Sequence, residues 1–136
     1  MAVDLSKKAQ AFLLELRFAV LATINQDGTP QLTTMWYLLE DDGTILMNTK
    51  VGRLKERNLR RDPRISICIE HDYNFITING TVQLIDDPQR TQNDIYRLSA
   101  RYHGEEKARG QMQDQFSKET RMSLLLKPER VIEYFE

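Results

Sequence analysis

The sequence is poor in cysteine, in histidine and in long apolar runs, and each scarcity argues against a class of protein. A single cysteine cannot form an internal disulfide, and with only two histidines beside it no metal-ligand spacing occurs. No apolar run approaches the roughly 18 residues that a membrane-spanning helix needs. The N-terminus also lacks the basic start and apolar stretch of a secretion signal. We therefore expect a cytoplasmic protein with neither a metal site nor a membrane partner.

Side-chain constellations for hydrolytic catalysis are also missing from the sequence. Ser66 follows no nucleophile-elbow pattern, and the pairs Asp41-Asp42 and Asp86-Asp87 lie at turns or helix starts, where aspartate bonds the local backbone. Cys68 falls in the alternating run 65–69, which predicts a small buried thiol rather than a nucleophile. The sequence thus offers no catalytic residue, and if the protein is an enzyme, a cofactor carries the reactive chemistry.

The composition is otherwise that of an ordinary globular protein. The chain has 136 residues, 40% hydrophobic and 29% charged, which fits one domain over residues 1–136 with a core of its own. Its formal net charge is only −1. Strong binding to a nucleic-acid duplex normally requires a broad positive field, so we expect no nucleic-acid partner.

One segment, residues 50–63, departs from this balance because it is strongly basic. It holds six of the nineteen lysines and arginines against two carboxylates. Such an excess is typical of a site for a small anion, because arginine and lysine match phosphate and carboxylate oxygens. The alternative is a solvated helix face, with Glu56 and Arg60 as an ordinary surface pair. Composition alone leaves both interpretations open.

Apolar periodicity and turn signals predict several strands and a few helices. The i, i+3, i+4, i+7 spacing in residues 9–16 predicts an amphipathic helix, with Ser6 as a cap near its start. Strands are predicted at residues 18–24, 29–39, 45–49, 65–70, 74–85, 121–126 and 131–135. The basic segment, residues 89–103 and residues 105–118 are predicted helices, the last two largely solvated.

The predicted strand 29–39 has two different faces. One face carries Leu32, Thr34, Trp36 and Leu38. We expect that face to contribute to the core, and the opposite face, from Gln31 to Tyr37, to line a site or to be half exposed.

The predicted strand 74–85 contains the pair Asn79-Gly80, which is also a common hairpin turn. The apolar alternation keeps its phase through Gly80, which favours one long strand with a close approach at the glycine. Early hairpins and six or seven short strands then predict an antiparallel barrel with attached helices, not a parallel α/β fold.

Three stretches of the sequence resemble one known family. They are residues 19–33, with the turn Asp-Gly-Thr-Pro, residues 55–66, with the rather specific run Asn-Leu-Arg-Arg-Asp-Pro, and residues 80–84. In kind and order they are similar to the pyridoxamine 5'-phosphate oxidase-like split β-barrel proteins. Within that superfamily the sequence is most similar to the short members that use the deazaflavin coenzyme F420 instead of FMN. The resemblance implies a mainly β split barrel of six to seven mostly antiparallel strands with flanking helices.

The resemblance also implies a homodimer with a cofactor in a groove at the subunit interface. The third strand and the start of the basic helix would hold the phosphate-bearing tail, through Asn48, Thr49, Lys50, Arg53, Lys55 and Asn58. The ring system would rest against Thr33, Thr34, Met35 and Trp36. Tyr73, Asn74 and Phe75 would complete the pocket, from the same subunit or the other. Core packing is an equal alternative for Trp36 and Phe75.

The basic residues are not equivalent in this scheme. Arg53 and Lys55 are two positions apart, about 200° on a regular helix, so they converge on one anion only near the first turn. First-turn amides and the helix dipole also favour an anion there. Arg57, Arg60 and Arg61 lie further along, as surface charges or as contacts to the acidic glutamyl tail of the coenzyme.

The function implied by the resemblance is hydride transfer from reduced F420 to a small conjugated or unsaturated acceptor. The protein would contribute orientation, desolvation and electrostatic tuning. Tyr37 or solvent would supply a proton, so no catalytic residue is assigned. The alternatives are an FMN-binding oxidoreductase of the same fold and a non-catalytic F420 carrier.

Overall fold

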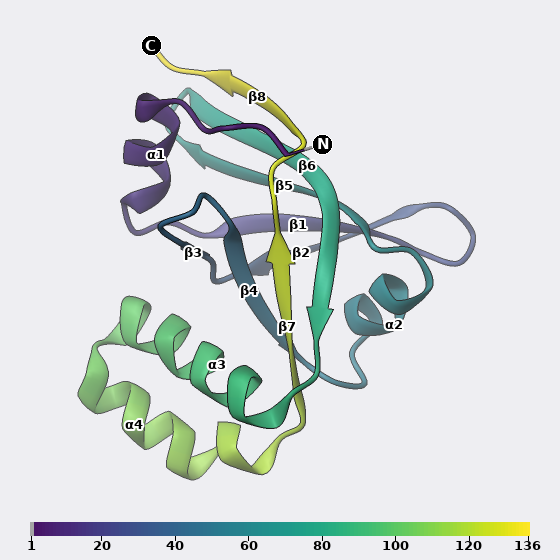
Figure 1. The fold of residues 1–136 in the computed structure, drawn as a ribbon, viewed down its shortest axis with the longest axis vertical. Coiled ribbons are helices and arrows are strands. Elements are labelled where there is room, and N and C mark those ends of the chain that lie inside the picture. Colours follow the sequence, from purple (N-terminus) through teal and green to yellow (C-terminus); the bar gives the residue numbers. More distant parts are fainter. Residues whose placement is uncertain (1) are drawn as a thin grey trace.

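The computed structural model describes residues 2–136, which contain four α-helices, one 3-10 helix and eight strands (Figure 1). The helices are α1 (Lys7–Leu14), α2 (Leu54–Arg61), α3 (Pro88–His103), α4 (Glu105–Asp114) and the 3-10 helix η1 (Phe116–Lys118). The strands are β1 (Ala19–Ile24), β2 (Pro30–Met35), β3 (Leu38–Leu39), β4 (Ile45–Lys50), β5 (Arg64–His71), β6 (Asn74–Ile85), β7 (Arg121–Leu126) and β8 (Arg130–Tyr134). Across these residues, no helix is long and apolar enough to span a membrane.

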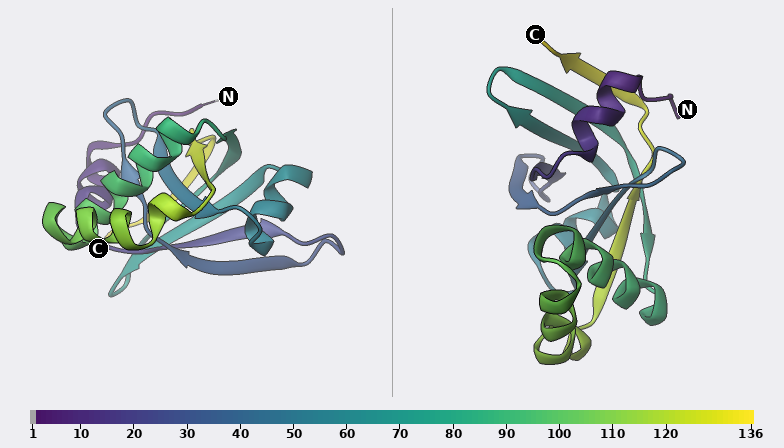
Figure 2. Two further views of the ribbon diagram at one scale, coloured as in Figure 1. Left: turned by 90° about the horizontal axis from the view of Figure 1, so that it is seen from below. Right: turned by 90° about the vertical axis from the view of Figure 1, so that its left-hand side faces the viewer.

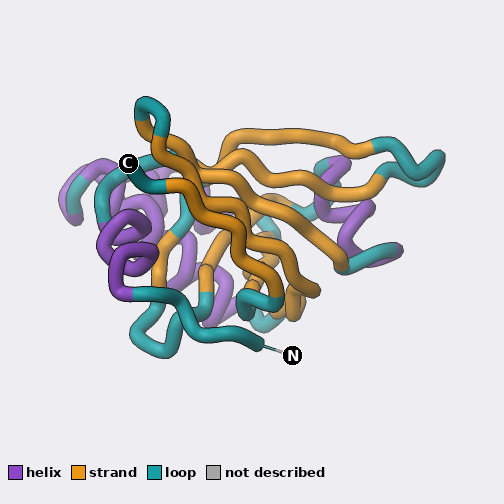
Figure 3. The backbone as a smooth tube through the Cα atoms, turned by 90° about the horizontal axis from the view of Figure 1, so that it is seen from above, coloured by secondary structure: helices purple, strands orange, loops and turns teal. Residues whose placement is uncertain are grey.

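The strands form one antiparallel sheet in the order β2-β1-β5-β6-β7-β4-β3, with β8 paired to β6. The sheet is curved and helices flank it (Figure 3). The two ends of this order, β2 and β3, are consecutive in the chain, so the sheet rolls up into a split barrel. The predicted mainly β, antiparallel split barrel with flanking helices is therefore confirmed. The structure assigns an eighth, two-residue strand, β3, because the strand predicted at residues 29–39 is divided in two.

The prediction for residues 29–39 was wrong in two respects. The strand breaks at Trp36, and the face that we expected in the core is divided. Leu32 is 62% exposed, whereas Trp36 and Leu38 pack against a cluster with Ile95 and Leu98. On the opposite face, Met35 and Tyr37 are buried. The break has a tertiary cause: the Tyr37 amide donates to the Tyr102 hydroxyl, and the Tyr37 hydroxyl donates to the Leu13 carbonyl at 2.8 Å. These bonds turn the chain from β2 into β3, and alternation alone does not reveal them.

An outer sheet face runs across β2, β1, β5, β6 and β8. The pairings that align Thr34 with Val20, Val20 with Cys68, Cys68 with Thr77 and Thr77 with Ile132 place these side chains in one row. Cys68 is therefore partly exposed, which corrects the prediction of a buried thiol. We call outer face the set Val20, Leu32, Thr34, Cys68, Thr77, Ile132 and Tyr134.

Strand β6 is continuous through Asn79-Gly80, as predicted. It pairs with β5 and β8 over its first part and with β7 over its second, so it joins the two halves of the barrel. A Cβ atom on Gly80 would lie 2.6 Å from a methyl of Leu126 and 2.8 Å from the Lys127 carbonyl oxygen. The glycine is required because another strand end passes over it.

The helices begin as their sequences predict, but they are less solvated than expected. The Ser6 hydroxyl caps α1, and the Asp87 carboxylate caps α3 just before Pro88. Helix α3 buries Ile95 and Leu98 in a small second core over β4 and β7, which corrects the expectation that it is largely solvated. Helix α4 packs on α3, so the two form a layer on one side of the sheet (Figure 2).

Arg101, near the end of α3, ties three segments together. Its guanidinium donates to the carbonyls of Leu13 and Glu15 at the end of α1, at 3.2 and 2.9 Å. It also donates to the Tyr37 carbonyl at 2.6 Å and to the Tyr102 hydroxyl at 2.9 Å. One side chain thus satisfies the carbonyls that end α1 and holds the corner between β2 and β3.

Candidate functional site

A pocket of about 290 Å³ lies between the end of β2, the middle of β4, the start of α2 and the α3–α4 layer. Its walls are Thr34, Met35, Trp36, Asn48, Arg53, Ile95, Leu98, Gln111, Gln115, Phe116 and Arg121. Two of these side chains are cationic and none is a carboxylate. The pocket therefore combines an apolar wall with a positively charged end, which suits a ligand with a flat apolar part and an anionic group.

Lys55, in the first turn of α2, is the most unusual charge at this end. Its side chain is buried, with 7% of the residue exposed, yet residues 2–136 give it no hydrogen bond and no ion pair. Burial lowers its pKa, and the positive charges of Arg53 and Arg121 lower that pKa further. A buried ammonium beside two guanidinium groups is costly unless an anion joins it. The arrangement therefore fits a bound phosphate or carboxylate.

At the start of α2, Arg53 and Lys55 are placed so that both can reach one anion, as the sequence argument required. Arg53 is the N-cap residue and Lys55 follows within the first turn, so both flank the same helix end. The Arg53 side chain makes no capping hydrogen bond to this end of the helix. The Glu56 carboxylate in the same turn is engaged at both oxygens, since it accepts from the Gly52 amide at 2.8 Å and from Arg60. First-turn amides and two cations are thus available to one anion.

Arg121, the first residue of β7, is the third cation of the site, and sequence reasoning missed it. Its Nε donates to Asn48 Oδ1 at 2.8 Å, its Nη1 donates to Glu119 Oε1 at 2.7 Å, and its guanidinium lies 5.1 Å from the centre of the Phe116 ring. Burial lowers its pKa, against the opposing effect of Glu119. Arg121 lies far from the basic segment in the sequence, so charge density could not reveal it. The one available signal was a charged residue at the start of an apolar strand.

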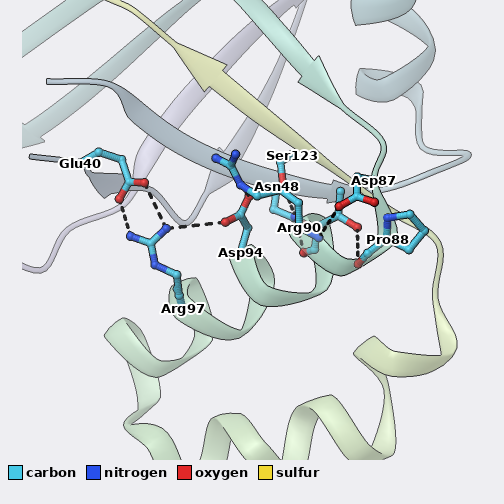
Figure 4. Close-up of polar contacts among 9 residues, drawn as sticks. Glu40, Asn48, Asp87, Pro88, Arg90, Asp94, Arg97 and Ser123 are labelled. Carbon is cyan, nitrogen blue, oxygen red and sulfur yellow. Dashed lines mark hydrogen bonds and ion pairs between the residues drawn. The ribbon is translucent and has the colours of Figure 1, made fainter. Parts of the chain in front are cut away.

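Asn48 is held by a buried polar network with Ser123 and Asp94 (Figure 4), and it also fixes Arg121. Its Nδ2 donates to the Thr91 carbonyl and to the Ser123 hydroxyl, both at 3.1 Å. Ser123 in turn donates to Asp94 Oδ2 at 2.7 Å. Since the Asn48 carbonyl oxygen already accepts from Arg121, its role in this chain is to position that guanidinium.

The structure brings most of the other predicted residues to this region. Thr34, Met35, Trp36 and Arg53 line the pocket, and Lys50 makes a 3.6 Å ion pair with Glu119. The hydroxyls of Thr33 and Thr49 are buried without a hydrogen-bond partner in the described chain. Unsatisfied buried hydroxyls on these two strands are consistent with a polar ligand that the chain alone does not provide.

Two groups of predicted residues lie elsewhere. Asn58 is buried, and its Nδ2 donates to Thr23 Oγ1 at 3.1 Å and to Asn25 Oδ1 at 2.9 Å, so it fastens α2 to β1. Residues 73–75 form the turn and start of β6 at the hairpin with β5, outside the pocket of their own chain. Tyr37 is also unsuited to donate a proton, because its hydroxyl is buried and bonded to a backbone carbonyl.

A larger groove of about 990 Å³ on the other side of α3 has no comparable charge imbalance. Arg97 there is paired with Glu40 and lies 3.6 Å from Asp94, and Arg90 donates to Asp94 at 2.8 Å (Figure 4). Because Arg90 and Arg97 are already paired with carboxylates, and four acidic residues line the groove beside its four basic ones, the groove offers less to an anion than the smaller pocket does.

The lowered pKa of Lys55 predicts a pH-dependent affinity for anions. An anion stabilises the charged amine, so affinity is greatest at low pH and falls as pH rises through the lowered pKa of the free protein. Sulfate is a suitable probe because its charge is constant from about pH 6 to 10, and the fluorescence of Trp36 reports on the pocket. We expect sulfate affinity in the native protein to fall at a lower pH than the ordinary lysine value of 10.5 would require, and to stay level in Lys55→Arg, whose side chain remains charged. If sulfate affinity of the native protein does not change with pH, Lys55 is not a buried amine without a partner.

The chain is thus a split antiparallel barrel with a cationic pocket beside its second strand. The family described as pyridoxamine 5'-phosphate oxidase matches residues 5–135 of the chain. The protein therefore belongs to this family, and the resemblance noted in the sequence is confirmed.

Solved structures with the same fold support this assignment. The conserved hypothetical protein Rv2991 from Mycobacterium tuberculosis is 28% identical, with a TM-score of 0.80, over 98% of this chain and 86% of that one. An F420 reductase is 22% identical, with a TM-score of 0.75, over 94% and 98% of the two chains. HutZ, the heme storage protein from Vibrio cholerae, is 20% identical, with a TM-score of 0.71, over 96% and 95%. The last two show the fold and no more.

Proposed function

We propose that the protein is an F420H2-dependent oxidoreductase that transfers a hydride to a small conjugated or unsaturated acceptor. The buried, unpartnered amine of Lys55 beside Arg53 and Arg121 carries the proposal, because F420 has a phosphate between its ring system and its tail. Family membership and the likeness to an F420 reductase give it further support.

Different residues of the pocket would contact different parts of such a coenzyme. Arg53, Lys55 and Arg121 bind the phosphate, and Met35 with Trp36 forms an apolar wall that excludes water from the ring. Strand β2 pairs only with β1, so the amides on its other edge are free to bond the polar edge of the ring. When bound, F420 supplies the hydride chemistry. With Tyr37 buried, solvent supplies the proton that completes the reduced product.

We also propose that the protein is a homodimer with the coenzyme near the subunit interface. The outer face exposes 39% of Val20, 62% of Leu32, 45% of Ile132 and 49% of Tyr134, an apolar area that a second copy would cover. Residues 73–75 lie outside the pocket of their own chain, at the tip of a hairpin with Tyr73 79% exposed. In a dimer through the outer face they are available to the partner's pocket.

Leu32→Asp is expected to separate the dimer, because it places a charge at the most exposed apolar position of the outer face. Sedimentation equilibrium at micromolar concentration should give twice the chain mass for the native protein and the chain mass for the variant. Leu54→Asp is a matched control, since Leu54 is 43% exposed on α2 and lies outside the outer face, and it should remain dimeric. A native protein of single-chain mass would rule out the proposed dimer.

The proposed activity is tested by mixing the protein with chemically reduced F420 and a panel of acceptors that includes quinones, enones and nitroaromatics. We expect the absorbance of oxidised F420 to appear with at least one acceptor, and to disappear in Lys55→Met. Tight binding of F420 without turnover of any acceptor would instead identify a carrier protein.

A further inference from the structure

A buried chain of hydrogen bonds connects the pocket to Asp94 on α3, a residue that does not line the pocket. Arg121 Nε donates to Asn48 Oδ1 at 2.8 Å, and Asn48 Nδ2 donates to the Ser123 hydroxyl at 3.1 Å. That hydroxyl donates to Asp94 Oδ2 at 2.7 Å (Figure 4). We call these four residues the hydrogen-bond relay. Each of them is at most 6% exposed, so water does not readily replace a partner that is lost.

All three hydrogen bonds of the relay run in the same direction, and its two ends fix that direction. A guanidinium only donates, and an ionised carboxylate only accepts. The Asn48 amide cannot be turned round, because its Nδ2 also donates to the Thr91 carbonyl at 3.1 Å, and a reversed amide would present a second donor to Arg121. Both hydrogens of Asn48 Nδ2 are therefore used, so the Ser123 hydroxyl donates to Asp94. Hydrogen bonds that are aligned in this way strengthen one another.

Asp94 needs two arginines to hold its charge at the far end of the relay. The residue is 1% exposed, Arg90 Nε donates to its Oδ2 at 2.8 Å, and Arg97 Nη1 lies 3.6 Å from its Oδ1. Asp94 Oδ1 has no hydrogen bond within residues 2–136, so Oδ2 carries the link to Ser123. Apolar residues fill a buried position without such partners and often with equal stability. The buried charge therefore indicates a role other than stability.

The pocket end of the relay leaves part of Arg121 for a ligand. Its Nε and Nη1 are held by Asn48 and Glu119, whereas its Nη2 makes no hydrogen bond in the described part of the chain. We propose that Asp94 is a positioning residue for the anion in the pocket, because through Ser123 and Asn48 it holds the Arg121 guanidinium with Nη2 available to that anion. The inference rests on the proposed function for the identity of the anion. A guanidinium that is held before binding loses little side-chain entropy when the anion binds.

Double-mutant cycles with Arg121→Met test the relay. The affinity for sulfate is measured by Trp36 fluorescence, and the affinity for F420 by deazaflavin fluorescence. Ser123→Ala removes the middle of the relay and leaves Asp94 paired with Arg90, whereas Asp94→Asn removes the charge at its end. We expect each change to weaken the binding of both ligands by about three- to tenfold in the native protein. In Arg121→Met each should change affinity by less than about twofold, because the relay acts only through that guanidinium.

Glu40→Gln is the matched control, because Glu40 pairs with Arg97 beside Asp94 and takes no part in the relay. It loosens the same side of α3 and should change the affinity for either ligand by less than about twofold.

Two results would overturn the inference, and both differ from a failure of the proposed function. If Ser123→Ala and Asp94→Asn weaken binding equally in the native protein and in Arg121→Met, they act by loosening the fold, and Asp94 is not a positioning residue. If neither change weakens binding in the native protein, the relay has no part in binding. Ser123→Ala alone decides between these results if Asp94→Asn does not fold. Binding of sulfate without binding of F420 would contradict the proposed function, and the sulfate cycle would still decide on the relay. A native protein that binds neither ligand would overturn both.

Discussion

Replacing Lys55 by methionine is expected to weaken F420 binding by about 1.5–3 kcal/mol, roughly 10- to 150-fold in Kd, while leaving the ligand-free protein at least as stable. The loss follows from removing a charged donor to the phosphate. The unchanged or raised stability follows from removing a buried amine that has no partner in the described chain. Isothermal titration with F420 and chemical unfolding without ligand measure the two effects.

Weaker F420 binding together with unchanged or higher stability would show that Lys55 serves binding and does not stabilise the fold. Lys8→Met, at an exposed position of α1, is the control and should change neither quantity by more than about 0.5 kcal/mol. If Lys55→Met unfolds more easily and binds F420 normally, Lys55 stabilises the fold through a contact that the account overlooks, and the anion site is misplaced.

Arg101→Met is expected to lower the free energy of unfolding by about 2–4 kcal/mol, because three backbone carbonyls in two segments, two of them in partly buried hydrogen bonds, would lose a charged donor together. The same change should loosen the corner between β2 and β3, so that the Trp36 side chain becomes more mobile and its fluorescence changes. Urea unfolding, followed by far-UV circular dichroism and by the fluorescence of Trp36, measures both effects.

The control for Arg101 is Arg109→Met, because Arg109 is 63% exposed and its one ion pair, to Glu105, spans 3.9 Å. Its loss should cost less than about 0.5 kcal/mol. Equal stability of the Arg101 and Arg109 variants would show that the guanidinium of Arg101 is not the link between α1, α3 and the β2–β3 corner.

Local signals predicted much of the fold because they act over a few residues. Ser6 and Asp87 cap the helices that their positions indicated, and the phase of the alternation through Gly80 distinguished a long strand from a hairpin. The strand 29–39 was predicted wrongly because its break depends on Tyr102 and Leu13, which lie far away in the sequence. Its more apolar face is divided, with Leu32 exposed and Trp36 and Leu38 packed against the second core, and alternation alone does not reveal that division.

In the site, too, local signals predicted some residues, and others depend on contacts between distant parts of the chain. Arg53 and Lys55 were predicted from the density of charge in one segment and the geometry of a first helical turn, and the structure places both beside the pocket. Arg121 was missed because only the pairing of β4 with β7 brings it there. Asn58 lies in the same segment but faces β1, which only the packing of α2 determines.

The central claim is that the cluster of Arg53, Lys55 and Arg121 binds the phosphate of a deazaflavin coenzyme. Parallel titrations of the native protein with F420 and with FMN, followed by quenching of Trp36 and by coenzyme fluorescence, test it most directly. The account predicts one F420 per chain, with affinity at least about tenfold higher than for FMN and weakened in Arg121→Met as in Lys55→Met. A protein that takes up FMN and ignores F420, or that binds F420 equally well without these cations, would contradict it.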